Sequence, residues 1–213
     1  MPLSAQAQAI LDGLDMDSPR MGDVKKLAAQ VKKDHTLALE LWATGGYAAR
    51  LVAVLILDKA ELTQASIEAL ADDMGSHPAA LRDRLSEWFM AHQLMKSKKT
   101  IALLETWRAH RSPTLRRLYW YYQGRLRWMG KIPVDNAPEL LAILTETMGT
   151  EPPEVQWAMN FTAGWIGVYE PAHRDACVAL GTKLGLYKGD PVSRGCTPNY
   201  LPEFIAIEAA KRA

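Results

Sequence analysis

The sequence predicts an all-α protein in which paired antiparallel helices stack into an α-solenoid, or α–α superhelix. Apolar residues recur at helical spacing along almost the whole chain of 213 residues, and no stretch shows the sustained alternation that a strand requires. The expected helices also come in pairs that are joined by turns of a few residues. With 48% hydrophobic and 23% charged residues, the chain has the composition of a globular protein that can bury a core.

Six helices are expected in the first part of the chain. The first four follow from apolar spacing alone. Thr63 can cap the fifth through its hydroxyl, and Gly75 stands where that helix ends. His77 and Pro78 mark the start of the sixth, because proline is tolerated in the first turn. The expected helices cover residues 4–13, 22–33, 36–43, 46–58, 63–74 and 78–95.

Six more helices are expected in the remainder. Ser112 followed by Pro113 is an N-cap and first-turn pair, and Gly149 stands where a helix ends. Pro153 and Pro171 each open a new helix. These helices cover residues 98–110, 113–129, 137–148, 153–167, 171–185 and 202–212.

The helix pairs repeat at a regular interval. Successive pairs begin near Thr63, Lys98, Ala137 and Pro171, about 35, 39 and 34 residues apart, which is typical of HEAT-type repeats. An irregular helical bundle is the alternative, because the repeats share negligible sequence identity. We expect one domain over residues 1–213, in which residues 186–213 form a C-terminal extension packed on the repeats.

The segment from Ala91 to Lys131, here called the basic segment, departs sharply from the near-neutral charge of the whole chain. It holds ten Lys or Arg residues against one acid, Glu105, for a net charge of +9, while the remainder carries −8. Cations that neutralise phosphates, together with rings that stack on bases, are typical of nucleic-acid-binding surfaces. Six aromatic residues interleave with the cations: Trp107, Tyr119, Trp120, Tyr121, Tyr122 and Trp128.

In a solenoid the second helices of the pairs, here 78–95, 113–129 and 153–167, line the concave surface. On the helix at 113–129, helical spacing predicts an outward stripe of Arg117, Tyr121, Gly124 and Trp128. Gly124 would let a phosphate backbone approach closely. The alternative is a solvated basic face whose aromatics pack in the core. The candidate DNA-binding residues are Arg116, Arg117, Tyr121, Arg127, Lys96, Lys98, Lys99, Arg108 and Arg111.

Several other classes of function lack support in the sequence. The longest apolar run, residues 51–57, is too short to cross a bilayer, so we expect no membrane association and a cytoplasmic protein. Cys177 and Cys196 have no metal-ligand spacing, and no phosphate-binding glycine loop occurs. We therefore expect no metal, no nucleotide cofactor and no other cofactor.

The helix at 78–95 carries the candidate catalytic group. Asp83 and Glu87 lie one turn apart, whereas Trp88 and His92 are expected on the buried side. Such a carboxylate pair is often only a solvated face. A carboxylate that faces DNA is repelled by the phosphates, so a function must outweigh this repulsion. One such function is to stabilise the positive charge that develops at a sugar carbon as a glycosidic bond breaks.

Several segments resemble the bacterial DNA alkylation repair proteins, the AlkD-like family of HEAT-like repeat DNA glycosylases. The most specific is MGDVKKLAAQVKKDHTLALELWATGGYAARLVAVLILD, from Met21 to Asp58. SPTLRRLYWYY is similar to the family's arginine-bearing repeat, and PPEVQWAMNFTAGWIG is similar to its last central helix. GLYKGDPVSRGCTPNYLPEFI is similar to the closing segment of some members. The likeness covers residues 20–205.

The resemblance implies a DNA glycosylase that grips duplex DNA and removes cationic purines such as 3-methyladenine or 7-methylguanine without base flipping. Asp83 matches the family's catalytic aspartate and Arg117 its DNA-contacting arginine. Three positions depart from the pattern: Ala79 and Phe161 replace aromatics of the family, and Gly164 stands where an arginine is common. A relative that binds DNA without base excision and a HEAT scaffold for protein partners are the alternatives.

Overall fold

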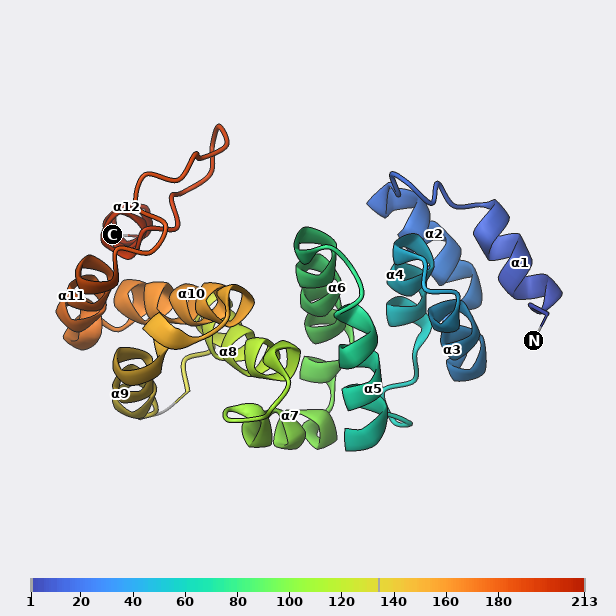
Figure 1. Cartoon of the computed structure of the whole chain (residues 1–213), viewed down its shortest axis with the longest axis horizontal. Helices are drawn as coiled ribbons and strands as arrows, with labels where there is room; N and C mark the ends of the chain where they lie inside the picture. Colours follow the sequence, from blue (N-terminus) through green and yellow to red (C-terminus); the bar gives the residue numbers. More distant parts are fainter. Residues whose placement is uncertain (1, 134, 213) are drawn as a thin grey trace. The chain divides into compact units, whose positions relative to one another are not determined.

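The computed structural model describes residues 2–133 and 135–212, and the chain forms two compact units that divide between Leu115 and Arg116 (Figure 1). Every regular element of the described residues is a helix. An α-helix lies at each of the twelve places where the apolar spacing predicts one, which confirms the all-α prediction.

Local side-chain hydrogen bonds define some of the helix starts in the first unit. The Thr63 hydroxyl accepts a hydrogen bond from the Ser66 amide, as its predicted capping role requires. The helix expected at 78–95 ends sooner, because Gln93 leaves the helical conformation and its side-chain Nε2 donates to the Val54 carbonyl at 2.6 Å. The helices are α1 (Ala5–Asp12), α2 (Met21–Val31), α3 (His35–Ala43), α4 (Tyr47–Ile56), α5 (Gln64–Met74), α6 (Ala79–His92) and α7 (Lys98–Leu104), with 3₁₀ turns at Leu94–Lys96 and Glu105–Trp107.

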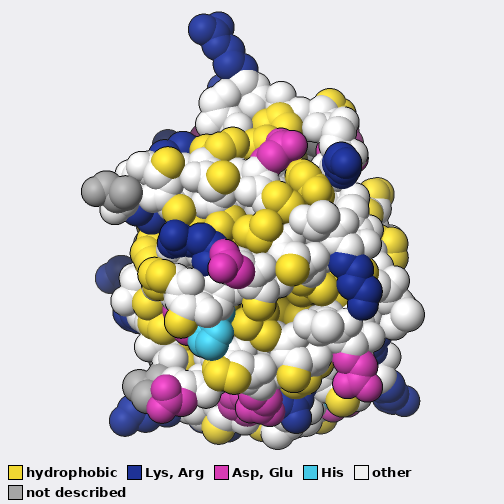
Figure 2. All heavy atoms as spheres, turned by 90° about the vertical axis from the view of Figure 1, so that its left-hand side faces the viewer, with side chains coloured by type: hydrophobic (Ala, Val, Ile, Leu, Met, Phe, Trp, Pro, Cys, Tyr) yellow, Lys and Arg dark blue, Asp and Glu magenta, His cyan; other side chains and the backbone are white. Residues whose placement is uncertain are grey.

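The second unit takes in all but the start of α8 (Pro113–Trp128), which begins just before the division. Its other helices are α9 (Ala137–Thr147), α10 (Pro153–Tyr169), α11 (Arg174–Leu184) and α12 (Leu201–Ala210), with 3₁₀ turns at Met148–Thr150 and Pro171–His173. Figure 2 shows the face on which α9, α11 and α12 lie, where hydrophobic side chains are spread between interspersed cations and carboxylates.

Helix α4 is the centre of the first unit. Eight of its ten residues are buried, and it packs against α2, α3 and α6. The buried Arg50 guanidinium donates to the Asp73 carbonyl at 2.7 Å and lies 2.9 Å from His77 Nε2. Burial lowers the pKa of His77, and the Arg50 charge lowers it further, so the neutral imidazole accepts this hydrogen bond at neutral pH. Arg50 thereby ties α4 to the end of α5 and the turn that follows.

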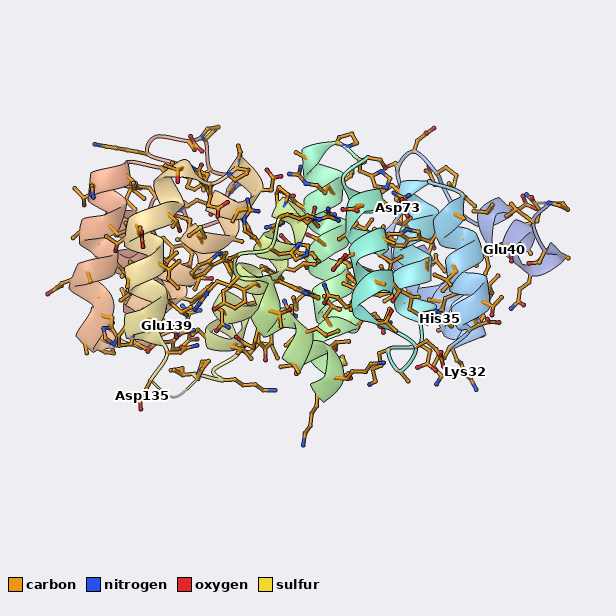
Figure 3. All side chains as sticks on the ribbon, turned by 60° about the horizontal axis from the view of Figure 1, so that its bottom comes forward. Lys32, His35, Glu40, Asp73, Asp135 and Glu139 are labelled. Atoms are coloured by element: carbon orange, nitrogen blue, oxygen red, sulfur yellow. The ribbon has the colours of Figure 1, made fainter. Side chains whose placement is uncertain are left out.

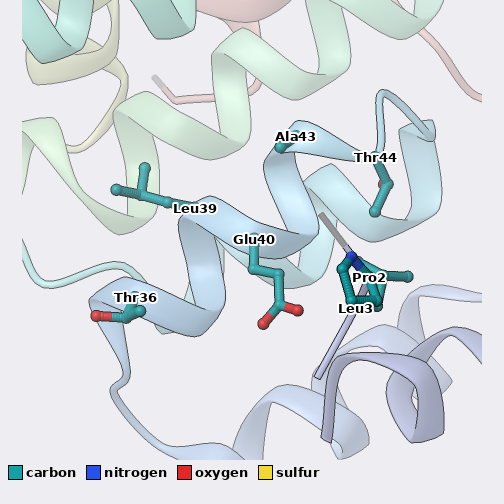
Figure 4. A pocket seen from close by; sticks show the side chains of 7 residues that line it. All are labelled: Pro2, Leu3, Thr36, Leu39, Glu40, Ala43 and Thr44. Carbon is teal, nitrogen blue, oxygen red and sulfur yellow. The ribbon is translucent and has the colours of Figure 1, made fainter. Parts of the chain in front are cut away.

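The N-terminal residues lie against α3. Ser4 caps α1 and hydrogen-bonds through its amide and its hydroxyl to the Glu40 carboxylate. Figure 4 shows Glu40 with Pro2 and Leu3 at a cavity of about 730 Å³. Figure 3 labels Glu40 together with Lys32, the residue that follows α2, which has a positive φ of 69°. These contacts close the first end of the repeat array.

The C-terminal helix α12 packs on α10 and α11. Helices α11 and α12 approach so closely that position 181 requires glycine, because a Cβ at Gly181 would lie 2.4 Å from the Leu201 Cβ. At the other end of α12, burial raises the pKa of Glu208, but hydrogen bonds outweigh this effect and lower it to about 2. The donors are Lys211, Thr197 and Arg212. These contacts hold the chain end onto the unit.

Candidate nucleic-acid interface

The cations of the basic segment fall into two groups in the structure. Those that precede α8 belong to the first unit and are exposed, as a contact with DNA requires. Lys99 lies near α4, where its Nζ donates to the Ala60 carbonyl at 3.1 Å. The five exposed cations are Lys96, Lys98, Lys99, Arg108 and Arg111, and their predicted role in DNA binding remains a prediction.

The predicted outward stripe of α8 is wrong. Only 1% of Arg117 and 7% of Tyr121 are exposed, although Trp128 is 47% exposed. The reason is that α10 packs on this side of α8. A Cβ at Gly124 would lie 2.5 Å from Cδ1 of Phe161, so the glycine admits an aromatic ring of α10 and not a phosphate backbone.

Three rings of α8 and α10 form a stack in place of that stripe. Tyr121 and Phe161 are stacked at 5.3 Å, and Trp157 and Phe161 are nearly parallel, at 5.5 Å and 9°. The Arg117 guanidinium lies over Trp157 at 4.6 Å, and Arg125 lies over Tyr121 at 5.9 Å. We call these five residues the arginine–aromatic stack. Both of its α10 rings are partly exposed.

The row of aromatic rings continues along α10 at intervals of one turn. Trp165 meets Phe161 edge to face at 6.1 Å and stacks on Tyr169 at 5.7 Å. Arg212 covers both of the later rings, at 4.9 Å from Trp165 and 5.6 Å from Tyr169. The i, i+4 spacing of these rings is visible in the sequence, but the cation that covers them comes from the far end of the chain.

Arg127 has a structural role inside the second unit that the sequence does not reveal. Its side chain is fully buried, whereas we predicted that it contacts DNA. Its Nε donates to the Glu170 carboxylate at 2.6 Å, and its other nitrogens donate to the Asn136 side chain and the Gln123 carbonyl. Arg116 likewise pairs with Glu151 at 2.8 Å, with 16% of its side chain exposed. Both arginines therefore hold helices of the second unit together.

The candidate catalytic residue lies on α6 in the first unit. The Asp83 side chain is 28% exposed, and its Oδ1 accepts a hydrogen bond from the neighbouring Arg82 at 3.0 Å. The Trp88 and His92 rings lie 5.0 Å apart at an angle of 48°, and the Lys25 ammonium lies 5.8 Å from the Trp88 ring. The expectation that His92 fills the core is wrong, since this residue is exposed.

The three departures from the family pattern have different surroundings. Ala79 is the first residue of α6 and is exposed. Phe161 is the middle ring of the arginine–aromatic stack. Gly164 faces the C-terminal helix, because a Cβ there would lie 2.8 Å from the Phe204 ring. An arginine at position 164 would therefore collide with α12.

Three observations on the described residues bear on other kinds of site. Among residues 2–133 and 135–212, no three His, Cys, Asp or Glu side chains are grouped so that they could hold a metal ion. None of the helices in this part of the chain has the length and apolar character of a membrane span. Burial raises the pKa of the Cys177 thiol to about 12, so this cysteine is a poor nucleophile.

Comparison with known proteins yields a family match and a structural match. A family model described as DNA alkylation repair enzyme matches residues 17–166. A solved structure from a new family of proteins related to the HEAT-like repeat DNA glycosylases, with affinity for branched DNA structures, has a TM-score of 0.68 and 18% sequence identity. The match covers 99% of this chain and 90% of that one, which confirms the HEAT-like fold class. None of the curated proteins compared with the sequence matches it.

Proposed function

The chain belongs to the DNA alkylation repair enzyme family, and we propose that it is a repair protein that binds duplex DNA. The arginine–aromatic stack is the observation that carries this proposal. The Arg125 guanidinium and the Trp157 and Phe161 rings are partly exposed, so they offer positive charge for phosphates and ring surface for bases, while the buried Arg117 guanidinium lies against Trp157. The exposed cations before α8 supply a second basic surface for the DNA backbone.

We further propose that the protein is a DNA glycosylase for cationic N-alkylpurines. A positively charged base such as 3-methyladenine is already a good leaving group, so the enzyme needs mainly to stabilise positive charge that develops on the deoxyribose. Asp83 supplies a partly exposed carboxylate for this purpose. Water then attacks the sugar carbon, the N-glycosidic bond breaks, and the base leaves without having been flipped into a pocket.

Release of 7-methylguanine from methylated duplex DNA tests the catalytic proposal. We expect release by the wild-type protein and its loss in Asp83→Asn, with DNA affinity kept, because the substitution removes a charge and preserves shape. Asp72→Asn is the matched control, since Asp72 is an exposed carboxylate on the neighbouring helix α5. No release by the wild-type protein would refute the glycosylase proposal and leave the DNA-binding proposal standing.

Two contacts favour a second candidate, a protein that binds DNA structures without excising a base. Arg82 already engages the Asp83 carboxylate, and Phe204 occupies the space beside Gly164 where the family often carries an arginine. The structurally similar protein has affinity for branched DNA. On this reading, a four-way junction should bind more tightly than a linear duplex of the same length, with no base released from either. Equal affinities would count against this candidate.

A further inference from the structure

The end of α8 carries a patch of exposed apolar side chains. Within the described residues eight large hydrophobic side chains are exposed, and three of them fall between positions 128 and 132. These three are Trp128, Met129 and Ile132, whose exposed fractions lie between 42% and 47%, and we call them the Trp128 patch. Single exposed apolar residues are ordinary on a protein surface, whereas a group of them marks a binding surface.

The backbone holds the Trp128 patch in a fixed conformation at the end of the helix. Gly130 has a φ of +70°, and its amide donates to the Arg127 carbonyl at 2.8 Å. The Lys131 amide donates to the Leu126 carbonyl, also at 2.8 Å, so a Schellman motif closes α8. Because the backbone is already ordered, little conformational freedom is lost when the patch binds a partner.

Arg125 connects the Trp128 patch to the arginine–aromatic stack. Its guanidinium lies 5.1 Å from the centre of the Trp128 ring and 5.9 Å from that of Tyr121, and its Nη1 donates to the Tyr121 hydroxyl at 3.2 Å. In the described part of the chain no second aromatic ring stacks on Trp128. The patch therefore continues the proposed DNA interface and adds an exposed indole on which a ring from outside can stack.

The charges around the patch favour an anionic partner. Lys131 is exposed within it, and Arg125 is partly exposed beside it. The sequence has no Asp or Glu between Glu105 and Asp135. Asp135 is exposed just beyond the patch and opposes an anion, but water and salt screen this charge. A flat apolar ring between cations suits a nucleotide, because the base can stack on the ring while the phosphate meets a cation.

An unpaired nucleotide fits the Trp128 patch better than a paired one. Inside a duplex the neighbouring bases cover both faces of each base, so the indole could reach a face only after unstacking, which costs free energy. A base at a fork, in a gap or in a single strand already has an open face. We infer that Trp128 stacks on an unpaired base of DNA, while Lys131 contacts a phosphate beside it. This inference rests on the proposed DNA-binding function and names the form of DNA that the site prefers.

Affinities for three DNA ligands test the inference: a duplex, a fork with the same base pairs and two unpaired arms, and one single strand of that fork. The wild-type protein should bind the fork more tightly than the duplex. Trp128→Ala should weaken fork binding by about fivefold or more, the effect of losing one stacked base, and leave duplex binding almost unchanged. Trp128→Phe keeps a ring and should retain most of the preference. Leu39→Ala is the matched control, because Leu39 is an exposed apolar residue of α3, and it should change neither affinity.

The fluorescence of 2-aminopurine at the first unpaired position of the fork reports stacking directly. The wild-type protein should quench it and Trp128→Ala should not, whereas the same analogue paired within the duplex should show no difference between the two proteins. Quenching that requires Trp128 on the single strand would support the inference even if the protein bound no duplex. Duplex binding without any such quenching would overturn the inference and leave the proposed function standing.

Two further outcomes count against the inference. Equal affinity of the wild-type protein for fork and duplex would overturn it, since the patch would then recognise no unpaired base. Sedimentation velocity tests the other occupant of an apolar patch, a second copy of this chain. A wild-type dimer that Trp128→Ala dissociates would make the patch a contact between protein copies and would also overturn the inference.

Discussion

Replacement of Arg127 by methionine tests whether this arginine stabilises the fold or binds DNA. The Arg127 guanidinium is fully buried and donates to Glu170, Asn136 and the Gln123 carbonyl. Methionine keeps the volume of the aliphatic stem but leaves the Glu170 carboxylate without its cation. Removing one partner of a buried ion pair costs about 3–5 kcal/mol. Because 17% of the Glu170 side chain is exposed, we expect the lower end, about 3 kcal/mol, in the second unit.

The assay is thermal unfolding followed by circular dichroism, together with duplex affinity measured at a temperature where both proteins are folded. A loss of about 3 kcal/mol corresponds to a melting temperature lower by roughly 10–20 °C for a unit of this size. Lys131→Met is the control, because Lys131 is an exposed cation of the same basic segment, and surface changes alter stability by about 0.5 kcal/mol at most. The structural assignment is refuted if Arg127→Met keeps the wild-type melting temperature and binds DNA more weakly.

Three further predictions concern α8, α10 and α12. Gly124→Ala should destabilise the second unit by about 1–3 kcal/mol, measured by urea unfolding, because its Cβ would lie 2.5 Å from the Phe161 ring; unchanged stability would contradict the packing. Arg125→Ala removes the partly exposed cation of the arginine–aromatic stack, so it should weaken duplex affinity and lower its salt slope by about one unit, and a slope equal to that of the wild-type protein would argue against a phosphate contact. The pKa of Glu208 is lowered to about 2, so its contribution to stability is complete above about pH 4.5 and is lost as the pH falls toward 2. Glu208→Gln should flatten the acid unfolding profile in that range, and a profile like that of the wild-type protein would count against it.

The helices could be predicted because the information for them is local. Apolar spacing, capping residues and prolines act within one or two turns, and the predicted Thr63 cap is present in the structure. The errors at helix ends had distant causes. The helix expected at 78–95 stops at His92, where the hydrogen bond from Gln93 to the Val54 carbonyl crosses from one helix to another.

The orientation of α8 could not be predicted from its own sequence. Residues Tyr119 to Tyr122 are four aromatics in a row, so rings point in every direction around the helix and the apolar spacing selects no single buried side. All four are buried. Contact with α10 determines which side of α8 is buried, because the Phe161 ring occupies the space that Gly124 leaves open.

The sequence alone determined the class of this protein, its helices, and the presence of a strongly basic segment with interleaved rings. These features depend on residue type and near neighbours along the chain. Only the tertiary structure decided which arginines pair with carboxylates and which lie on aromatic rings. The physical reason is that the burial and the partners of a side chain depend on residues far away in the sequence, as the pairing of Arg127 with Glu170 demonstrates.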